Sequence, residues 1–276
     1  MFTNSVRAGP TTPPCQRAEC CERHPPAGAA LGRTRHPRTL VQGFERSPCV
    51  RQKAGSQGRE GNALINDMGP PTVGAMASEY VIRIARADDA AALAAIYSPY
   101  VASAPTSFET EAPSADEMAR RCALIQASLP WLVCEVDGAV HGYAYASRHH
   151  ERAAYQWSCD SGVYVAAGAH RRGVGRALYT VLFALLRLQG YCAVHAGITL
   201  PNPASVGLHE ACGFRPVGVY PRVGYKLGAW HDVGWWQLEL SPRVGEPPPL
   251  VGLSQVLSER SEAAAAAFAA GRRVLG

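Results

Sequence analysis

The sequence lacks the marks of several protein classes. No apolar run approaches the roughly 18–20 residues that a membrane-spanning helix needs. It has no Cys-x-x-Cys pair, and its histidines follow no zinc-ligand spacing, so we expect no bound metal. It also has neither a Gly-x-Ser-x-Gly elbow nor a Walker phosphate loop, which argues against a serine hydrolase and a P-loop nucleotidase.

Residues 1–75 are poor in the side chains that build a core. They hold no Trp, no Tyr and two Phe, against nine Pro and nine Gly. Such a composition buries too little apolar surface to offset the entropy of ordering. The segment also lacks the apolar centre of a secretory signal. We interpret residues 1–75 as a disordered leader or a mis-assigned start, residues 76–240 as the domain, and residues 241–276 as a tail with at most a short helix.

The sequence after residue 75 has no excess of either charge. The formal charge of +5 comes from residues 1–75, whereas residues 76–276 contain seventeen basic and seventeen acidic residues. The basic isoelectric point therefore indicates no nucleic-acid-binding face on the domain. Its cysteines lie in apolar patterns, as buried thiols do in a reducing compartment. We expect a cytoplasmic protein with no nucleic-acid or membrane partner.

Hydrophobic periodicity predicts a mixed α/β domain. Period-two patterns and turn signals predict strands at 80–85, 131–136, 139–147, 155–165, 191–200, 214–225 and 230–240. Helical patterns are centred on Leu93–Tyr100, Met118–Leu129 and Leu178–Leu186, and Asn202 begins a shorter helix. This order is typical of a single sheet with helices on both faces.

A strand, a glycine loop and a helix follow one another after Val163. Gly173 and Gly175 stand at the mouth of the helix, beside Arg171 and Arg172. Glycine lets a ligand approach the backbone, and the unpaired N–H groups and positive dipole end of a helix favour phosphate. Arginines add bidentate donors. The pattern indicates a pyrophosphate-binding loop; the alternative is a structural turn with two solvated arginines.

Two segments, HRRGVGRAL and NPASVGLHEACGF, resemble the GNAT superfamily of acetyl-CoA-dependent N-acetyltransferases. The segments PWLVCEVDG, AYQWSCDSGVYV and VGYKLGAWHDVGWWQL narrow the resemblance to its phosphinothricin N-acetyltransferase branch. The resemblance covers about residues 80–240. It implies a mixed sheet whose central strand pair splays apart around acetyl-CoA.

The resemblance also implies where the co-substrate lies. The pantetheine arm and thioester meet the backbone of the strand at 163–165, the pyrophosphate rests on the loop at 171–176, and Asn202 bonds the cofactor arm while also capping its helix. The cofactor-binding residues implied in this way are Val163, Tyr164, Val165, Arg171, Arg172, Gly173, Val174, Gly175, Arg176 and Asn202.

Amide formation needs a base for the amine and a proton for the departing thiolate. Asp160 is our candidate base; the branch usually has Glu there, and the shorter Asp favours action through a bound water. The alternative for Asp160 is a solvated or bulge-forming carboxylate. His209 stands where the branch has a histidine, so it is the candidate acid or base. Its alternative is a core histidine with a satisfied ring.

An acidic acceptor needs fixed cations. Lys226 matches a lysine of the family, whereas His150 replaces a Lys or Arg of the branch, so that Arg148, Arg152 or His149 would take over its role. Phe108 is a candidate wall of the acceptor pocket. The alternative interpretation of each of these cations is a solvated surface charge. The alternative for Phe108 is a side chain packed in the core.

The resemblance implies acetyl transfer from acetyl-CoA to a small amino acid or analogue of the phosphinothricin, methionine sulfone or methionine sulfoximine type. A polyamine, an aminoglycoside or a protein N-terminus is the alternative acceptor. A non-catalytic acyl-CoA-binding module is the alternative from another functional class. Family members are often homodimers, and the two closing strands are the candidate contact.

Overall fold

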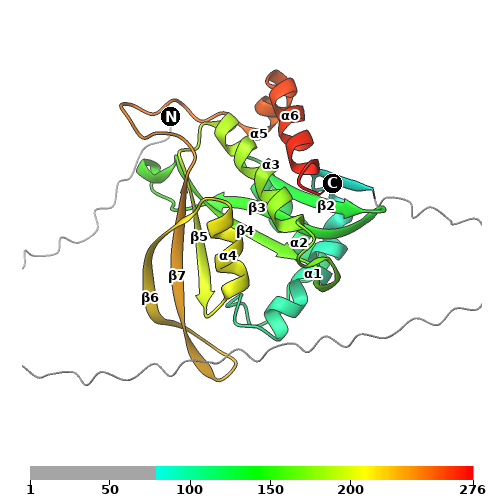
Figure 1. Cartoon of the computed structure of the whole chain (residues 1–276), viewed down its shortest axis with the longest axis vertical. Helices are drawn as coiled ribbons and strands as arrows, with labels where there is room; N and C mark the ends of the chain where they lie inside the picture. Colours follow the sequence, from blue (N-terminus) through cyan, green and yellow to red (C-terminus); the bar gives the residue numbers. More distant parts are fainter. Residues whose placement is uncertain (1–78, 276) are drawn as a thin grey trace, which may run out of the picture. The chain divides into compact units, whose positions relative to one another are not determined.

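The structure is a computed structural model that describes residues 79–275 (Figure 1). The interpretation of residues 1–75 as a leader therefore lies outside the described residues. One seven-stranded sheet forms the centre, in the order β1-β2-β3-β4-β5-β7-β6. The strands are β1 (Tyr80–Ile84), β2 (Trp131–Val136), β3 (Ala139–Arg148), β4 (Ser158–Val165), β5 (Ala193–Leu200), β6 (Arg215–Lys226) and β7 (Ala229–Glu239). The mixed α/β sheet is confirmed.

The only parallel pair among these strands is β4 with β5. It is short: Ser158–Asp160 pair with Ala193–His195, and no pairing continues beyond that point in the described sheet. Both strands run on for several residues, to Val165 and Leu200. The central pair therefore forms a V that is closed at Asp160 and opens toward Val165, as expected.

Helices cover both faces of the sheet. α1 (Ala90–Ala102) and α2 (Ala115–Gln126) pack on one face, where Leu93, Met118 and Trp131 belong to one buried cluster. α3 (Val174–Gln189) packs on the other face, where Leu178 and Leu182 belong to a larger cluster. α4 (Pro203–Ala211) links β5 to β6, and the short 3-10 helices are η1 (Ala87–Asp89), η2 (Ala153–Tyr155) and η3 (Ala167–Ala169).

The turn and cap signals form as the sequence predicts. The Ser114 hydroxyl accepts the N–H of Glu117 at 3.2 Å and begins α2. Asp137 and Gly138 both have positive φ, at 50° and 82°, as a type I′ hairpin requires. The Asn202 side chain accepts the N–H of Ser205 at 3.1 Å, so the expected cap of α4 is confirmed.

Two strands start later than expected. β4 begins at Ser158, because Ala153–Tyr155 form a 3-10 turn rather than the predicted start of the strand. β5 begins at Ala193. Trp157 still joins the two segments: its carbonyl accepts the N–H of Cys192 at 2.9 Å, and its indole donates to Pro248 O at 2.9 Å. The aromatic residues Tyr155 and Trp157 give this turn the alternating pattern of a strand, which explains the early start in the sequence prediction.

The C-terminal segment differs from the expected tail. It forms two helices, α5 (Leu253–Glu259) and α6 (Ser261–Arg272), and α6 packs along α3 (Figure 1). Ala264 and Ala267 are buried, and a side chain on Gly271 would lie only 2.9 Å from Ile82 Cδ1 and 3.0 Å from Ala177 O. Small residues give a weak hydrophobic pattern, and for this reason the sequence does not predict that α6 packs on the domain. The same small residues let α6 and α3 approach closely.

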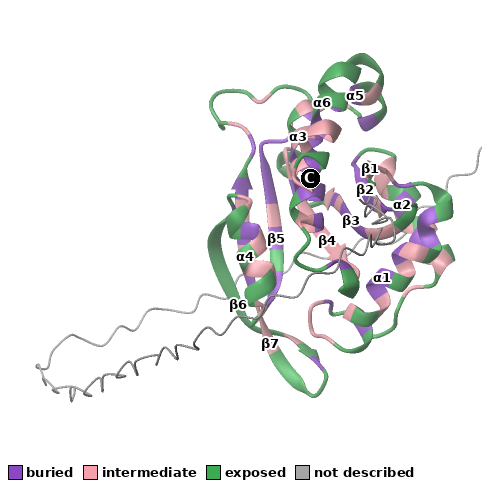
Figure 2. Ribbon diagram, turned by 45° about the vertical axis from the view of Figure 1, so that its right-hand side comes forward, coloured by how far each residue is buried: buried purple, intermediate pink, exposed green. Residues whose placement is uncertain are grey.

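The outer strand β6 and the β6–β7 turn are largely exposed (Figure 2), and they carry many apolar side chains. Their large exposed apolar residues are Val217, Val219, Tyr220, Val223, Tyr225, Leu227 and Trp230. Within residues 79–275, no helix has both the length and the apolar character to cross a membrane.

Candidate active site

Asp160 lies where the V between β4 and β5 closes. It pairs with Ser147 of β3 and is the last residue of β4 in register with β5, opposite His195. Its side chain keeps 30 % of its exposure, so solvent or substrate can reach it. Burial raises the pKa of the carboxyl, and a hydrogen bond from His149 acts in the opposite direction. A carboxylate with a raised pKa is a better proton acceptor than a solvated one.

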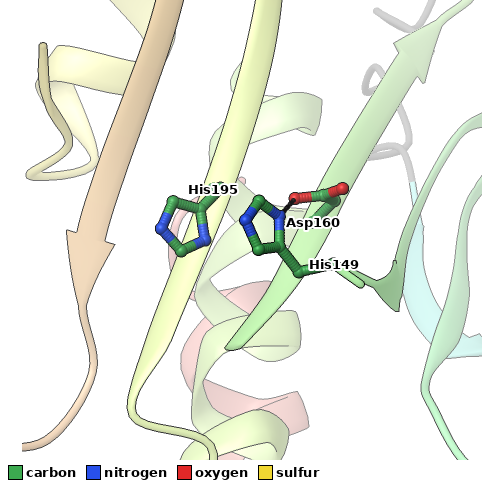
Figure 3. Close-up of side chains that lie close together, drawn as sticks. All are labelled: His149, Asp160 and His195. Carbon is green, nitrogen blue, oxygen red and sulfur yellow. Dashed lines mark hydrogen bonds and ion pairs between the residues drawn. The ribbon is translucent and has the colours of Figure 1, made fainter. Parts of the chain in front are cut away.

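Two histidines flank this carboxylate (Figure 3). His149 Nδ1 lies 2.7 Å from Asp160 Oδ1. The ring of His149 stacks on His195, with centroids 4.3 Å apart and planes at 17°. His195 Nε2 lies 3.2 Å from Gln237 Oε1, whereas its buried Nδ1 has no hydrogen-bond partner among the described residues.

From the sequence, His149 is a candidate only as a cation that takes the place of His150, and no sequence pattern connects His195 with Asp160. The three residues lie at the end of β3 and on β4 and β5, and only the strand register brings them together. The sequence does place a histidine in or next to each strand that neighbours the strand of Asp160. The spacing of these histidines along the chain, however, does not reveal that their side chains meet at Asp160.

The backbone of β4 faces the open part of the V, as expected for a pantetheine site. The N–H of Ala166 donates to His141 O at 2.8 Å, so by antiparallel alternation the backbone groups of Val163 and Val165 face away from β3. The carbonyl of Val165 is already engaged: Tyr100 OH donates to it at 2.6 Å, and His170 Nε2 lies 2.9 Å away. Val163 and the N–H of Val165 are therefore the better contacts for a cofactor.

Tyr164 points to the opposite side from this opening. Its ring packs edge-on against Tyr97 and Tyr100, with centroids 4.8 Å and 5.3 Å away. By the same alternation its backbone groups pair with Tyr143 of β3, so neither its ring nor its backbone faces the opening, and its role in cofactor binding stays a prediction.

The backbone N–H groups between the glycine loop and the first turn of α3 are free to bind a ligand. Gly173 precedes α3 with a left-handed φ of 82°, and its carbonyl accepts the first helical bond from Ala177 at 2.9 Å. The first N–H groups of a helix have no partner within it, and none of those at 173–176 donates to a backbone carbonyl in the described part of the chain. Arg171 and Arg172 are exposed beside them. This geometry suits an anion.

Both glycines also have a packing role. A side chain on Gly173 would lie 3.3 Å from the carbonyl of Val274, and one on Gly175 would lie 3.1 Å from Leu208 Cδ2. Substituting either glycine therefore disturbs the C-terminal segment or α4 as well as the loop. Arginine variants separate ligand binding from packing more cleanly.

His209 is buried and both ring nitrogens are engaged. Nδ1 lies 2.8 Å from Ser205 O, and Nε2 lies 2.9 Å from Tyr179 OH. Tyr179 is in turn 3.4 Å from Ser161 Oγ on β4, so a chain of polar groups leads from His209 toward the V. This geometry matches the core-histidine alternative, and the catalytic role of His209 stays a prediction. Tyr179 lies on the apolar face of α3 and carried no separate signal.

Burial lowers the pKa of His209 below its ordinary value of 6.5. The unfolded chain therefore binds a proton more readily than the folded one, and stability falls as the pH drops below about 6.5. We expect the melting temperature to fall less between about pH 7 and pH 5 in His209→Gln, which does not titrate, by about 3 °C. Thermal melts at several pH values measure this, and equal slopes for the two proteins contradict it.

The candidate substrate residues form two separate pairs. Lys226 is buried, its Nζ donates to Ser107 O at 2.6 Å, and desolvation lowers its pKa. Phe108 follows Ser107 and lies against Gly224, so the first pair joins the α1–α2 connection to β6. Arg148 and His150 lie instead at the end of β3, near Asp160. His150 contacts the rings of His149 and Tyr155.

Comparison with known proteins agrees with this geometry. The family profile described as "Acetyltransferase (GNAT) domain" matches residues 82–235. A phosphinothricin N-acetyltransferase of Streptomyces viridochromogenes is 41 % identical over 175 residues, which are 63 % of this chain and 95 % of the relative. An L-methionine sulfoximine/L-methionine sulfone acetyltransferase of Pseudomonas paraeruginosa is 32 % identical, covering 60 % of this chain and 98 % of the relative.

A solved structure carries the same fold. It is a GNAT superfamily phosphinothricin acetyltransferase of Sinorhizobium meliloti in complex with acetyl-CoA. It superposes with a TM-score of 0.59 at 32 % identity, over 63 % of this chain and 94 % of that one.

Proposed function

This chain belongs to the GNAT family of acetyltransferases, and from that premise we propose that it acetylates the α-amino group of a small amino acid or analogue. The acceptor class is of the phosphinothricin, methionine sulfone or methionine sulfoximine type, which the names of its relatives support. The observation that carries the proposal is the Asp160 carboxylate at the closed end of the V, where its side chain is 30 % exposed.

The loop before α3 binds the cofactor. Free N–H groups at 173–176 and the exposed Arg171 and Arg172 hold the diphosphate of acetyl-CoA. The pantetheine arm follows β4 through the backbone of Val163 and the N–H of Val165, which aims the thioester toward Asp160.

Asp160 accepts a proton from the acceptor ammonium group, directly or through a water. The neutral amine attacks the thioester carbonyl, a C–N bond forms, and the C–S bond breaks as the tetrahedral adduct collapses. The departing thiolate takes a proton to give CoA. We propose that this proton is the second one on the nitrogen, released as the C–N bond forms, and that the Tyr179–His209 pair relays it to the thiolate.

Arg172→Ala tests the cofactor site without disturbing packing, because Arg172 is exposed. Loss of one charge-assisted hydrogen bond to phosphate costs about 1.5–3 kcal/mol. We expect the KM for acetyl-CoA to rise about 10-fold or more, with kcat nearly unchanged. The control is Arg215→Ala, an exposed arginine on β6. Equal KM values for wild type and Arg172→Ala would remove the loop from the binding site.

The acceptor is tested with the full chain, acetyl-CoA and a panel of amines, by measuring thiol release. The panel contains phosphinothricin, methionine sulfone, methionine sulfoximine, a polyamine, an aminoglycoside and a peptide with a free N-terminus. We expect release only with the amino-acid analogues. Release only with another amine selects the alternative acceptor class. Cofactor binding without turnover on any amine selects the non-catalytic module.

We also infer a homodimer through the exposed apolar surface of β6 and the β6–β7 turn. Light scattering should give twice the chain mass for the wild type, and Val219→Lys should shift it toward the monomer, because a charge then stands in the exposed apolar surface of the edge strand. Leu124→Lys is the matched control, since Leu124 is an exposed apolar residue on α2. A monomeric wild type contradicts the inference. A cytoplasmic location stays a prediction, as does the absence of nucleic-acid and membrane partners.

A further inference from the structure

The cluster of His149, Asp160 and His195 has a composition that the acetyl-transfer chemistry does not require. One carboxylate would be enough for a general base. Here it is joined by two imidazoles, and the three side chains offer ligand atoms that all lie within 4.8 Å of one another (Figure 3). Two histidines and one aspartate form a ligand set that suits zinc and similar transition metals.

His195 supplies an observation that hydrogen bonding leaves unexplained. Its Nδ1 is buried and has no partner at hydrogen-bonding geometry among the described residues, although a buried polar atom is rarely left unpaired. The nearby Cys159 backbone acts only to raise the pKa of the ring, against the larger effect of burial. In Figure 3 the His195 ring lies beside the His149 ring, on which it stacks. The Nε2 of His195 is held by Gln237. A metal ligand whose other nitrogen is fixed by a hydrogen bond has the arrangement usual for histidine in metal sites.

The remaining ligands can reach an ion. A tetrahedral ion with bonds of about 2.1 Å holds its ligands about 3.4 Å apart. The ligand atoms now lie within 4.8 Å of one another, and His149 Nδ1 is only 2.7 Å from Asp160 Oδ1. To bind an ion, the more distant atoms must approach, the His149–Asp160 contact must widen, and the His149 ring must turn out of its stack on His195. His149 follows the last residue of β3 and is free of strand pairing, which permits this rotation. The side chains of His149 and Asp160 are 18 % and 30 % exposed, so an ion and a water ligand can enter from solvent.

We propose that His149, Asp160 and His195 form a binding site for a divalent transition-metal ion such as Zn²⁺, and that the ion inhibits acetyl transfer by occupying the Asp160 carboxylate. This reverses our expectation of no metal, which rested on spacing in the sequence. The inhibitory part rests on the proposed function of Asp160, whereas the binding part does not. A hard cation such as Mg²⁺ prefers a shell of oxygen ligands and should not replace Zn²⁺ here.

Binding is measured first, on the full chain without acetyl-CoA. Zn²⁺ is titrated by calorimetry into chelator-treated wild type, His195→Val and the control His141→Ala. We expect wild type and His141→Ala to bind one more Zn²⁺ than His195→Val. Because all three proteins keep the same cysteines, this difference in the number of bound Zn²⁺ ions reports on the His149–Asp160–His195 site alone. Identical binding by all three folded proteins overturns the proposal.

A second measurement needs no variant. In wild-type protein labelled with ¹⁵N, two histidine side chains should change their nitrogen shifts together at one equivalent of Zn²⁺, and the same amount of Mg²⁺ should change neither. This keeps the proposal testable if His195→Val does not fold. Histidine shifts that do not respond to Zn²⁺ overturn it.

Inhibition is measured second, with each protein compared to its own zinc-free activity. We expect Zn²⁺ to inhibit the wild type and His141→Ala at the concentration that fills the site, and His195→Val to need at least 10-fold more. Zinc binding without acetyl transfer to any acceptor would refute the proposed function and leave the metal site standing. Acetyl transfer with equal zinc sensitivity in all three proteins would refute the inhibitory role.

Discussion

Asp160→Asn is expected to lower kcat by about 10²–10⁴-fold, the usual contribution of a general base. The amide has nearly the shape of the carboxylate, so the hydrogen-bonding contact with His149 and the pairing of β4 with β5 should survive. The KM for acetyl-CoA should change little, because the proposed diphosphate site is the loop before α3 and not Asp160. Steady-state kinetics with the acceptor identified in the panel measures both quantities.

Two further variants sharpen this result. Asp88→Asn makes the same chemical change at an exposed aspartate beside α1 and should leave kcat unchanged. Asp160→Glu restores the longer carboxylate that is usual in the resembling branch, and it should retain much more activity than Asp160→Asn. A fully active Asp160→Asn enzyme would mean that water or another group takes the proton.

Ala267→Asp is expected to cause the largest loss of stability. Ala267 lies on the buried side of α6, with 6 % of its surface exposed. A charge placed there loses its hydration without a partner, at a cost of several kcal/mol. Each kcal/mol corresponds to about 2–4 °C in a domain of this size, so the melting temperature should fall by about 10 °C or more. Circular dichroism during heating measures the change.

The neighbouring position gives a matched control. Ala266 is exposed on the same turn of α6, so Ala266→Asp has the same helix propensity and charge without the burial. We expect its melting temperature to stay within about 2 °C of the wild type. Similar losses in the two variants would show that α6 does not stabilise the domain. Because α6 also places Val274 against Gly173, Ala267→Asp should weaken acetyl-CoA binding at temperatures where the protein is still folded.

Most of the fold could be predicted from local signals. Strand alternation, the Asp137–Gly138 turn and the Ser114 and Asn202 caps each act within a few residues, so the sequence displays them directly. The helices at 253–272 were harder to recognise, because alanine contributes little to a hydrophobic pattern. Their stability comes from close contact with α3, which is a property of the tertiary structure.

The sequence predicts on which strand or loop the candidate site residues lie, but it does not predict which other side chains they contact. Asp160 lies on β4 and residues 171–176 span the loop and the start of α3, as the sequence pattern predicts, while their roles stay predictions. The engagement of the Val165 carbonyl by Tyr100 and the enclosure of Lys226 by the carbonyl of Ser107 depend on segments far away in the chain. The grouping of His149 with His195 likewise depends on strand register, which one sequence does not reveal.

The contact of Val274 and Leu275 with Gly173 offers a way to observe the cofactor without a chemical assay. Arg273 is exposed and directly precedes this contact, so a fluorescent dye attached through Arg273→Cys would lie beside the loop that we propose as the diphosphate site. Its emission should respond when acetyl-CoA arrives. The same proximity advises against fusing an affinity tag to this end of the polypeptide when kinetics are to be measured.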